Sequence, residues 1–125
     1  MNIRYISAMD AYKAAQEGAL LADVREKAET SDVWLDMENV IFIPFSLFAQ
    51  LKKELPFDKQ LILCCAVGIV SEKAARLLSE AGYEHVFVLR NGLIAWQSAG
   101  LPLKTAAGLF CKCQCCNKNE NENDF

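Results

Sequence analysis

The sequence predicts one α/β domain with a mainly parallel central sheet flanked by helices on both faces. Short apolar runs alternate with segments of helical composition, which is the order typical of a parallel sheet with crossover helices. Several of these runs are apolar throughout, as strands buried on both faces are. The chain has 125 residues, of which 53% are hydrophobic. This is enough for one core and too little for two ordinary domains.

The first elements follow from composition and stop signals. Residues 3–6 are predicted to form a short strand, and residues 10–17 have helical composition with Gly18 as a stop. Residues 20–24 read Leu-Leu-Ala-Asp-Val, which is mostly apolar and predicts a buried strand.

The next stretch is less regular. Residues 26–38 are acidic and lack a clear period, so they are predicted to be a loop with room for one helical turn. Residues 40–43 are predicted to be a strand that ends at Pro44, and residues 45–53 a short helix.

The second half carries the clearest signals. Residues 61–64 are a short continuous apolar strand, and residues 71–81 have apolar side chains at helical spacing. A strand over 86–89 and a short helix over 93–98 complete the pattern. The domain is therefore expected to span residues 1–104, and residues 105–125 a cysteine-rich, flexible tail whose end is polar and acidic.

Charge and the ends of the chain limit the function classes. The formal net charge is -3, and no cluster of Lys and Arg argues for nucleic acid as a partner. The N-terminus shows no signal peptide, and no apolar run is long enough to cross a membrane. We therefore expect a cytoplasmic monomer that does not bind a membrane.

Six cysteines are unevenly placed, which argues against a disulfide framework in a cytoplasmic protein. Two lie in mid-chain, Cys64 and Cys65. The others crowd near the C-terminus: Cys111, Cys113, Cys115 and Cys116. Reactive or metal-binding thiols are the expected alternatives.

The loop after the strand over 61–64 is the candidate site, because ligands bind beyond the carboxyl ends of parallel strands. A tight loop at Gly68, followed by a helix N-terminus, can direct N–H groups and partial positive charge at Cys65 and favour its thiolate. The alternative is an inert buried thiol, and the charge of Glu72 counts against activation. The candidate substrate-binding residues are Ala66, Val67, Gly68, Ile69, Val70 and Ser71.

This segment resembles the active-site loop of the rhodanese family of sulfurtransferases, Cys-x-x-Gly-x-Arg-Ser after a strand. Cys65, Gly68 and Ser71 match that motif. Further pieces in the family's order are Asp23-Val24-Arg25-Glu26, Ile43-Pro44, Gly82-Tyr83 with Val86, Gly92, Ala95-Trp96 and Gly100-Leu101-Pro102. The resemblance implies a persulfide on Cys65 as catalytic residue, a sulfur donor and a thiol acceptor, either of which can be a protein.

The sequence departs from the family at several positions. Val70 replaces the loop arginine that would bind an anionic donor such as thiosulfate, and Asn91 replaces the first glycine of a Gly-Gly pair. We therefore expect the donor to be a persulfide or polysulfide. A phosphatase needs Cys followed by five residues and Arg. Val70 and Ser71 stand at those positions after Cys64 and Cys65, so neither has that arginine.

Four polar or reactive residues outside the cysteine loop are also considered. Asp23 and Arg25 support the loop or sit at its rim, or they form an ordinary strand-end ion pair. Cys64 is expected to face the core, because successive strand side chains alternate. His85 is expected to be structural.

The four tail cysteines suggest three alternatives: a soft-metal site, a relay that takes sulfur from Cys65, or a solvated tail whose thiols have no role. No cofactor is required. The leading hypothesis is a sulfurtransferase, and the alternative is a non-catalytic rhodanese-like module that binds a partner or senses metal or redox state.

Overall fold

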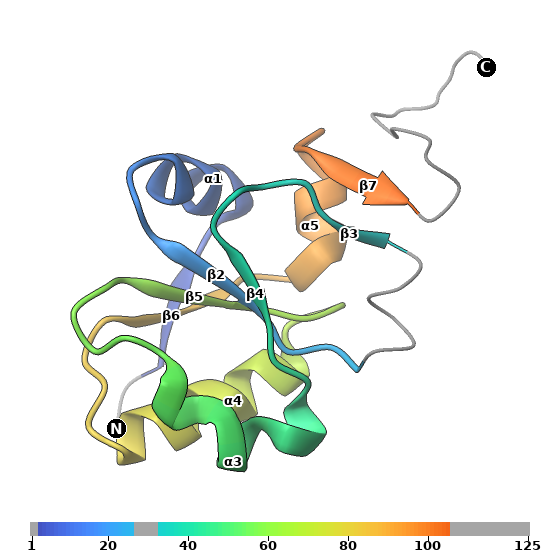
Figure 1. Cartoon of the computed structure of the whole chain (residues 1–125). Helices are drawn as coiled ribbons and strands as arrows, with labels where there is room; N and C mark the ends of the chain where they lie inside the picture. Colours follow the sequence, from blue (N-terminus) through green and yellow to red (C-terminus); the bar gives the residue numbers. More distant parts are fainter. Residues whose placement is uncertain (1–2, 27–32, 106–125) are drawn as a thin grey trace.

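The computed structural model describes residues 3–26 and 33–105, and it places them in a three-layer α/β arrangement (Figure 1). Five parallel strands form the central sheet in the order β1-β6-β5-β2-β4. Their bounds are β1 Arg4–Ile6, β2 Leu20–Asp23, β4 Val40–Phe42, β5 Leu61–Cys64 and β6 Val86–Leu89. This confirms the predicted fold class.

Helices cover both faces of this sheet (Figure 1). On one face lie α1 (Ala8–Gln16) and α5 (Gly92–Ser98). On the other lie α4 (Ile69–Glu80) and a short irregular run, η1 (Phe45–Leu47), α3 (Phe48–Leu51) and η2 (Lys52–Glu54). The helix expected over 45–53 is thus one α-helical turn between two 3₁₀ turns.

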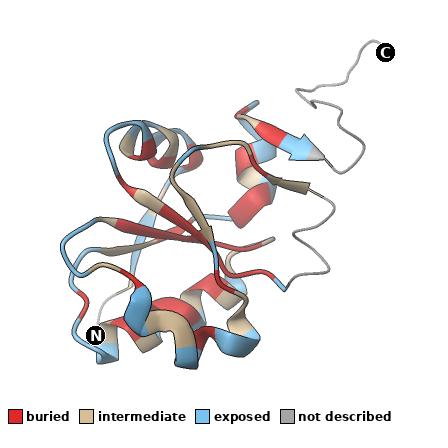
Figure 2. Cartoon of the chain, viewed as in Figure 1, coloured by how far each residue is buried: buried red, intermediate tan, exposed pale blue. Residues whose placement is uncertain are grey.

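Strand β5 is the centre of the core and is buried at all four positions (Figure 2). Its side chains alternate between the two helical layers, as a pleated strand requires. Ile62 and Cys64 pack on the side of α1 and α5, whereas Leu61 and Leu63 pack on the side of α4. The strand therefore presents Cys64 to one core and the following Cys65 to the other.

A two-stranded antiparallel ribbon corrects the sequence-based prediction at two places. Strand β3 (Val33–Leu35) lies inside the predicted loop 26–38, and it pairs with β7 (Leu103–Thr105), which the sequence did not reveal. Each strand has three residues, and its partner is about 70 residues away along the chain. Local pattern carries no signal for such a short, non-local pairing.

The described residues show neither a membrane-spanning helix nor a cluster of metal ligands. None of their helices has the length and apolar character needed to cross a bilayer. The cysteine-rich segment, with Cys111, Cys113, Cys115 and Cys116, lies outside the described residues. Within 3–26 and 33–105 no group of three His, Cys, Asp or Glu side chains gathers in a way that could hold a metal ion.

Candidate functional site

The cysteine loop joins the central strand β5 to the N-terminus of α4. Its turn is made at Gly68, whose φ of 101° is a left-handed conformation that side chains with a Cβ rarely adopt. This turn allows α4 to begin at Ile69, two residues before the predicted start at Ser71. Cys65 is therefore held between a rigid strand and a rigid helix.

Hydrogen-bond donors converge on the sulfur of Cys65. The Gly68 backbone N–H donates to Sγ at 3.0 Å, and the Ser71 N–H donates at 3.4 Å. The Ser71 hydroxyl also lies 3.3 Å from Sγ and at the same distance from the Gly68 carbonyl oxygen. Donors aimed at one atom from a loop and a helix N-terminus stabilise negative charge there.

A small pocket opens at this sulfur, although Cys65 itself is only 3% exposed. Its volume is ≈ 150 Å³. The lining is mostly apolar, and among the lining residues Arg25 carries the one positive charge. The full lining is Val24, Arg25, Glu26, Phe45, Cys65, Ala66, Val67 and Val70. Sequence reasoning identified the loop residues but missed Val24, Glu26 and Phe45 as walls of the pocket.

Of the predicted substrate-binding residues, three line the pocket and three do not. Ala66, Val67 and Val70 contribute side chains to its wall. Gly68 and Ser71 donate hydrogen bonds to the sulfur, whereas Ile69 is 64% exposed and does not line this pocket. The loop therefore contributes both apolar side chains to the pocket and hydrogen-bond donors to the sulfur.

The start of α5 holds the loop from behind. The Leu93 N–H donates to the Cys65 carbonyl oxygen at 2.8 Å, and the Ile94 N–H donates to that of Ala66 at 3.3 Å. Gly92 lies so close that a Cβ there would be 2.2 Å from the Cys65 carbonyl oxygen. The preceding residue, Asn91, has a φ of 59°, a left-handed conformation that Asn tolerates better than most residues. Asn91 can therefore stand where the family has glycine.

Asp23 and Arg25 form a buried pair rather than an exposed ion pair at the end of a strand. Asp23 is completely buried and Arg25 is 6% exposed. The Arg25 guanidinium contacts the carboxylate through Nε at 3.0 Å and Nη2 at 2.8 Å, and the Arg25 backbone N–H adds a bond at 3.0 Å. Nη2 also donates to the Val33 carbonyl oxygen at 2.7 Å. The pair fixes one wall of the pocket and attaches the β3–β7 ribbon to the end of β2.

Glu26 extends this wall toward the short helical run. Its carboxylate accepts from the Ser46 backbone N–H at 3.0 Å and from the Ser46 hydroxyl at 2.8 Å. These bonds satisfy a backbone donor at the start of η1 and hold the neighbouring Phe45 against the pocket. The pocket is therefore framed by β2, η1 and the cysteine loop.

Cys64 is fully buried and differs from Cys65 in its surroundings. Burial raises the pKa of the Cys64 thiol well above its usual range, and the negative charge of Asp23 adds to this effect. Its Sγ lies 3.6 Å from the Ile62 carbonyl oxygen, to which the thiol can donate. The predicted core-facing position of Cys64 is confirmed.

The raised pKa of Cys64 predicts a pH-dependent contribution to stability. Above about pH 8.5 the unfolded thiol ionises while the folded one stays protonated, so this contribution falls as pH rises, by up to about 1.4 kcal/mol per pH unit. Urea unfolding of the parent and of Cys64→Ala between pH 7 and 9.5 should show the steeper decline in the parent. Parallel declines in the two proteins would contradict this.

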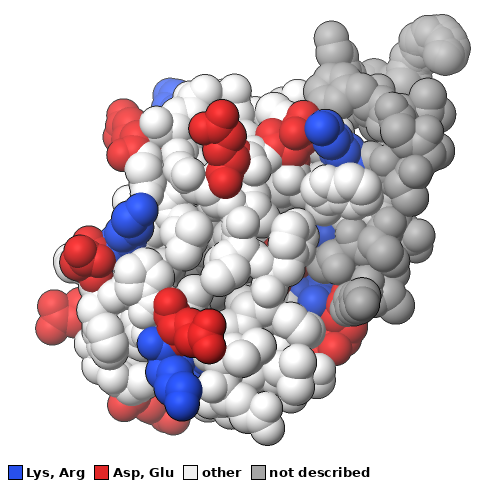
Figure 3. All heavy atoms as spheres, viewed as in Figure 1, with Lys and Arg blue, Asp and Glu red and all other residues white. Residues whose placement is uncertain are grey.

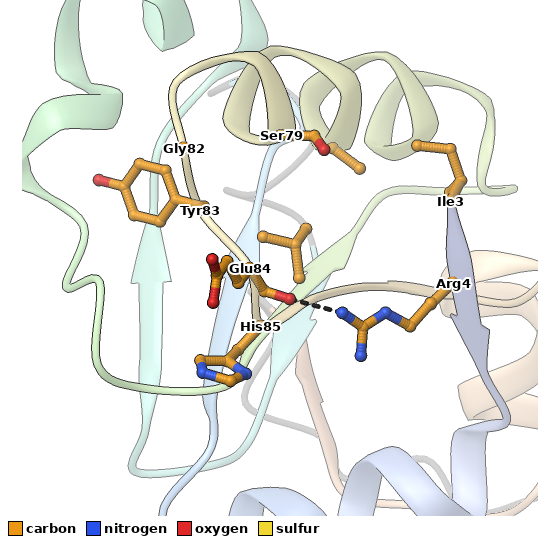
Figure 4. Close-up of a pocket in the computed structure, with 9 residues that line it drawn as sticks. Ile3, Arg4, Ser79, Gly82, Tyr83, Glu84 and His85 are labelled. Atoms are coloured by element: carbon orange, nitrogen blue, oxygen red, sulfur yellow. Dashed lines mark hydrogen bonds between the residues drawn. The ribbon is translucent and has the colours of Figure 1, made fainter. Parts of the chain in front are cut away.

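His85 lies at the other end of the sheet, beside a hollow of ≈ 530 Å³ (Figure 4). Arg4 donates from Nη2 to the Glu84 carbonyl oxygen at 2.6 Å across this hollow. Although it is larger than the pocket at Cys65, it shares no lining residue with that pocket. His85 is therefore no base for Cys65, and the chemistry belongs with the smaller pocket because that pocket contains the sulfur.

Charged side chains of both signs are interspersed on the face shown in Figure 3, with a broad uncharged region between them. Among the described residues on that face, no continuous basic patch is visible. In the first turn of α4, Glu72 accepts a hydrogen bond from the hydroxyl of Tyr5 in β1. Glu72 does not line the pocket at Cys65.

Comparisons with known proteins agree with this arrangement. The model of the rhodanese-like domain family matches residues 7–99. The thiosulfate sulfurtransferase GlpE of Haemophilus influenzae (strain PittEE) is 30% identical over 106 residues, covering 85% of this chain and 99% of that protein. A sulfurtransferase of Allochromatium vinosum is 33% identical over 95 residues, covering 76% and 87% of the two chains.

A solved structure gives the same result in three dimensions. The rhodanese-related protein from Thermoplasma volcanium superposes with a TM-score of 0.73 at 31% identity, covering 80% of this chain and 96% of that one. The family match spans most of the domain, including the cysteine loop, Asp23 and Arg25, and Gly92. On these grounds the chain belongs to the rhodanese-like domain family.

Proposed function

We propose that this protein is a sulfurtransferase that carries sulfane sulfur as a persulfide on Cys65 and passes it to a thiol acceptor. The observation that carries the proposal is the convergence of the Gly68 and Ser71 N–H groups on Cys65 Sγ at the floor of an open pocket. Because these N–H groups stabilise negative charge on the sulfur within an apolar pocket, the reaction does not need a neighbouring histidine.

The reaction consists of two balanced thiol-exchange steps. The Cys65 thiolate attacks the outer sulfur of a donor persulfide, the donor's S–S bond breaks, and the donor leaves as a thiolate. An acceptor thiolate then attacks the outer sulfur on Cys65 and releases the Cys65 thiolate. No electrons are gained or lost overall, so no redox cofactor is needed.

The pocket favours a persulfide or polysulfide as donor over thiosulfate. Its one cation, Arg25, is already paired with Asp23, and Val70 occupies the loop position of the family's arginine. A doubly charged anion would enter without a free positive side chain among the lining residues. The sulfur chain of a persulfide or polysulfide is soft and weakly hydrated, whereas the oxygens of thiosulfate are strongly hydrated, so the sulfur chain suits the apolar wall better.

The test is the intact mass of the reduced, desalted protein after exposure to inorganic polysulfide or to thiosulfate. The parent should gain about one sulfur atom with polysulfide, as expected for one persulfide per exchange step, and a Cys65→Ser variant should not gain sulfur at that position. Peptide mapping assigns the added sulfur to residues 60–73 or elsewhere. No gain at Cys65 with any donor would favour the alternative, a non-catalytic rhodanese-like module.

The Val70→Arg variant is expected to gain activity with thiosulfate. A guanidinium at this position can form charge-assisted hydrogen bonds to the anion, worth about 1.5–3 kcal/mol, or about 10–150-fold in kcat/KM. Val70→Met is the matched control, because it adds length without charge. Comparable kcat/KM values with thiosulfate for both variants would show that the missing charge does not limit the donor.

A further inference from the structure

A second hollow lies beside the cysteine loop, on the side of β6, whereas the pocket at Cys65 lies on the side of β2. Its volume is ≈ 230 Å³. The end of β6, the first turn of α4 and Tyr5 in β1 provide most of its walls. Val67 lines both spaces, and Gly68, whose N–H donates to Cys65 Sγ, lines this one. We name it the side hollow, and it adjoins the reactive loop directly.

The register of the sheet places Arg90, which lines the side hollow, level with Cys65. Strands β5 and β6 are parallel neighbours, with Leu63 opposite Val88. Cys65 and Arg90 each stand two residues further along their chains, and neighbouring strands lie about 4.7–4.9 Å apart. Leu63, Val88 and Cys65 all pack on the α4 side of the sheet. Since side chains two residues apart share a face, Arg90 is expected on that side as well.

The contacts of Arg90 agree with this placement and leave its charge available. Arg90 is exposed, and its Cζ lies 5.1 Å from the centre of the Tyr5 ring. Glu72, the carboxylate that lines the same hollow, accepts a hydrogen bond from the Tyr5 hydroxyl through one oxygen, and its other oxygen lies 4.0 Å from Arg76 Nη2. Among the described residues, no ion pair to Arg90 is found. The side hollow therefore offers one cation to an incoming anion.

An arginine held over an aromatic ring is well suited to a carboxylate. The ring contacts the face of the guanidinium, and the N–H groups at its edge can form two parallel hydrogen bonds to the carboxylate oxygens. Val67 and Ile69, which are 46% and 64% exposed, line the same hollow. The occupant thus has apolar atoms next to its carboxylate, as an Asp or Glu side chain does.

Each of the two spaces at the loop is too small for a complete ligand. Their volumes are ≈ 150 Å³ at Cys65 and ≈ 230 Å³ at the side hollow, and both lie below the range of about 300–1,000 Å³ of ligand pockets. Val67 stands between them as a shared wall. Alternate side chains of an extended peptide lie about 7 Å apart on one face. One peptide that crosses Val67 can therefore fill both spaces.

We infer that the side hollow binds an Asp or Glu side chain of a protein acceptor, two positions from the acceptor cysteine, and that Arg90 holds it. The inference rests on the proposed function, because the bound cysteine takes the sulfur from Cys65. The acceptor thiolate attacks the outer sulfur of the Cys65 persulfide, the S–S bond on Cys65 breaks, and Cys65 leaves as a thiolate. Arg90 binds the acceptor and does not contact the reacting sulfur.

The test compares acceptor peptides that differ only in charge. One is acetyl-Glu-Ala-Cys-Ala-Glu-amide, and the other has Gln in place of both Glu residues. Cys65 is loaded with inorganic polysulfide, the protein is desalted, and the loss of sulfur from residues 60–73 is followed by mass at rising peptide concentration. The ratio of kcat/KM for the Glu peptide to that for the Gln peptide is then compared between protein variants, which cancels the different reactivities of the two peptide thiols.

The variants are Arg90→Met, Arg90→Lys and the matched control Arg4→Met. Arg4 also stacks on an aromatic ring, with Cζ 5.2 Å from the centre of the Phe87 ring, but it lies at the opposite end of the sheet. Its replacement changes the net charge of the protein by the same amount. The control therefore separates binding in the side hollow from general attraction of an anionic peptide.

The ratio should fall about fivefold in Arg90→Met, which is the upper end for an exposed ion pair. Arg90→Lys should keep part of it, because it retains the charge but not the fork of donors. Arg4→Met should leave it unchanged. The change should lie in the half-saturating concentration of the Glu peptide rather than in the rate at saturation, and it should shrink at high salt.

Binding is also measured without sulfur transfer. The Glu peptide with Ser in place of Cys should protect Cys65 of the unloaded parent from iodoacetamide, and Arg90→Met should need about fivefold more peptide for the same protection. Absence of protection by this peptide in the parent would overturn the inference, whatever the transfer rates.

The other outcomes also have separate meanings. Equal ratios in the parent and Arg90→Met, or an equal fall in Arg4→Met, would overturn the inference and leave the proposed function intact. If glutathione depended on Arg90 as the Glu peptide does and saturated at a lower concentration, the side hollow would belong to a small carboxylated thiol, and the protein acceptor would be wrong. No sulfur on Cys65 in any variant would instead refute the proposed function.

Discussion

Replacing Gly92 with alanine is expected to destabilise the protein and reduce sulfur loading of Cys65 at the same time. The added Cβ would lie 2.2 Å from the Cys65 carbonyl oxygen and 2.5 Å from that of Ala66, and both are backbone atoms. Either the loop or α5 must move, which breaks the bonds from the Leu93 and Ile94 N–H groups. Overpacking of this kind costs about 1–3 kcal/mol, in addition to about 1–2 kcal/mol for the left-handed conformation.

The control for this variant is Gly100→Ala. Gly100 also has a positive φ, 74°, but nothing lies within 4 Å of the position its Cβ would take. The Gly100→Ala variant should therefore lose only the stability that the left-handed conformation costs, and the rate of sulfur loading of Cys65 should be unchanged. Urea unfolding and the rate of mass gain with polysulfide are measured on both variants. Equal destabilisation and equal loading would mean that close packing at Gly92 does not hold the loop in place.

The Asp23→Asn variant is expected to be strongly destabilised, because it leaves the buried Arg25 guanidinium without a counter-charge. Asp23 is fully buried, and its carboxylate receives hydrogen bonds from both the side chain and the backbone of Arg25. Removing one member of a buried pair costs about 3–5 kcal/mol. Denaturant unfolding measures the loss, and the polysulfide loading rate shows whether the pocket wall moves with it.

The matched control is Asp36→Asn in the exposed ion pair with Lys104, where the side-chain exposures are 40% and 59%. That pair belongs to the β3–β7 ribbon side of the molecule, but screening limits its value to about 0–1 kcal/mol. The double variant Asp23→Asn with Arg25→Met removes the unpaired charge and should recover part of the lost stability. A loss no larger for Asp23→Asn than for Asp36→Asn would show that the buried pair is not a major source of stability.

The centre of the main sheet could be predicted because β5 and β6 are continuous apolar runs. Strands β5 and β6 have the predicted bounds, and the predicted strand 20–24 ends one residue beyond β2. The cysteine loop followed from its place between the best strand and the best helix. For these elements the local sequence and the tertiary environment favour the same structure.

Other features could not be predicted from local sequence. Strands β3 and β7 stabilise each other across about 70 residues, so neither has a signal of its own. The contact of the Arg25 guanidinium with the Val33 carbonyl oxygen depends on that ribbon, so it could not be predicted either. The role of Gly92 depends on a backbone contact between α5 and the loop after β5, which no periodicity reveals.

The ribbon also has a consequence for the motions of the protein. Three-residue strands joined over a long sequence separation close late in folding and open early in local unfolding. Because Arg25 bonds to Val33, opening of the ribbon releases one contact of the pocket wall, whereas Cys65 stays attached to the buried strand β5. Amide hydrogen exchange should therefore be fast in β3 and β7 and slow in β5, so that entry to the pocket can fluctuate while the reactive sulfur stays in place.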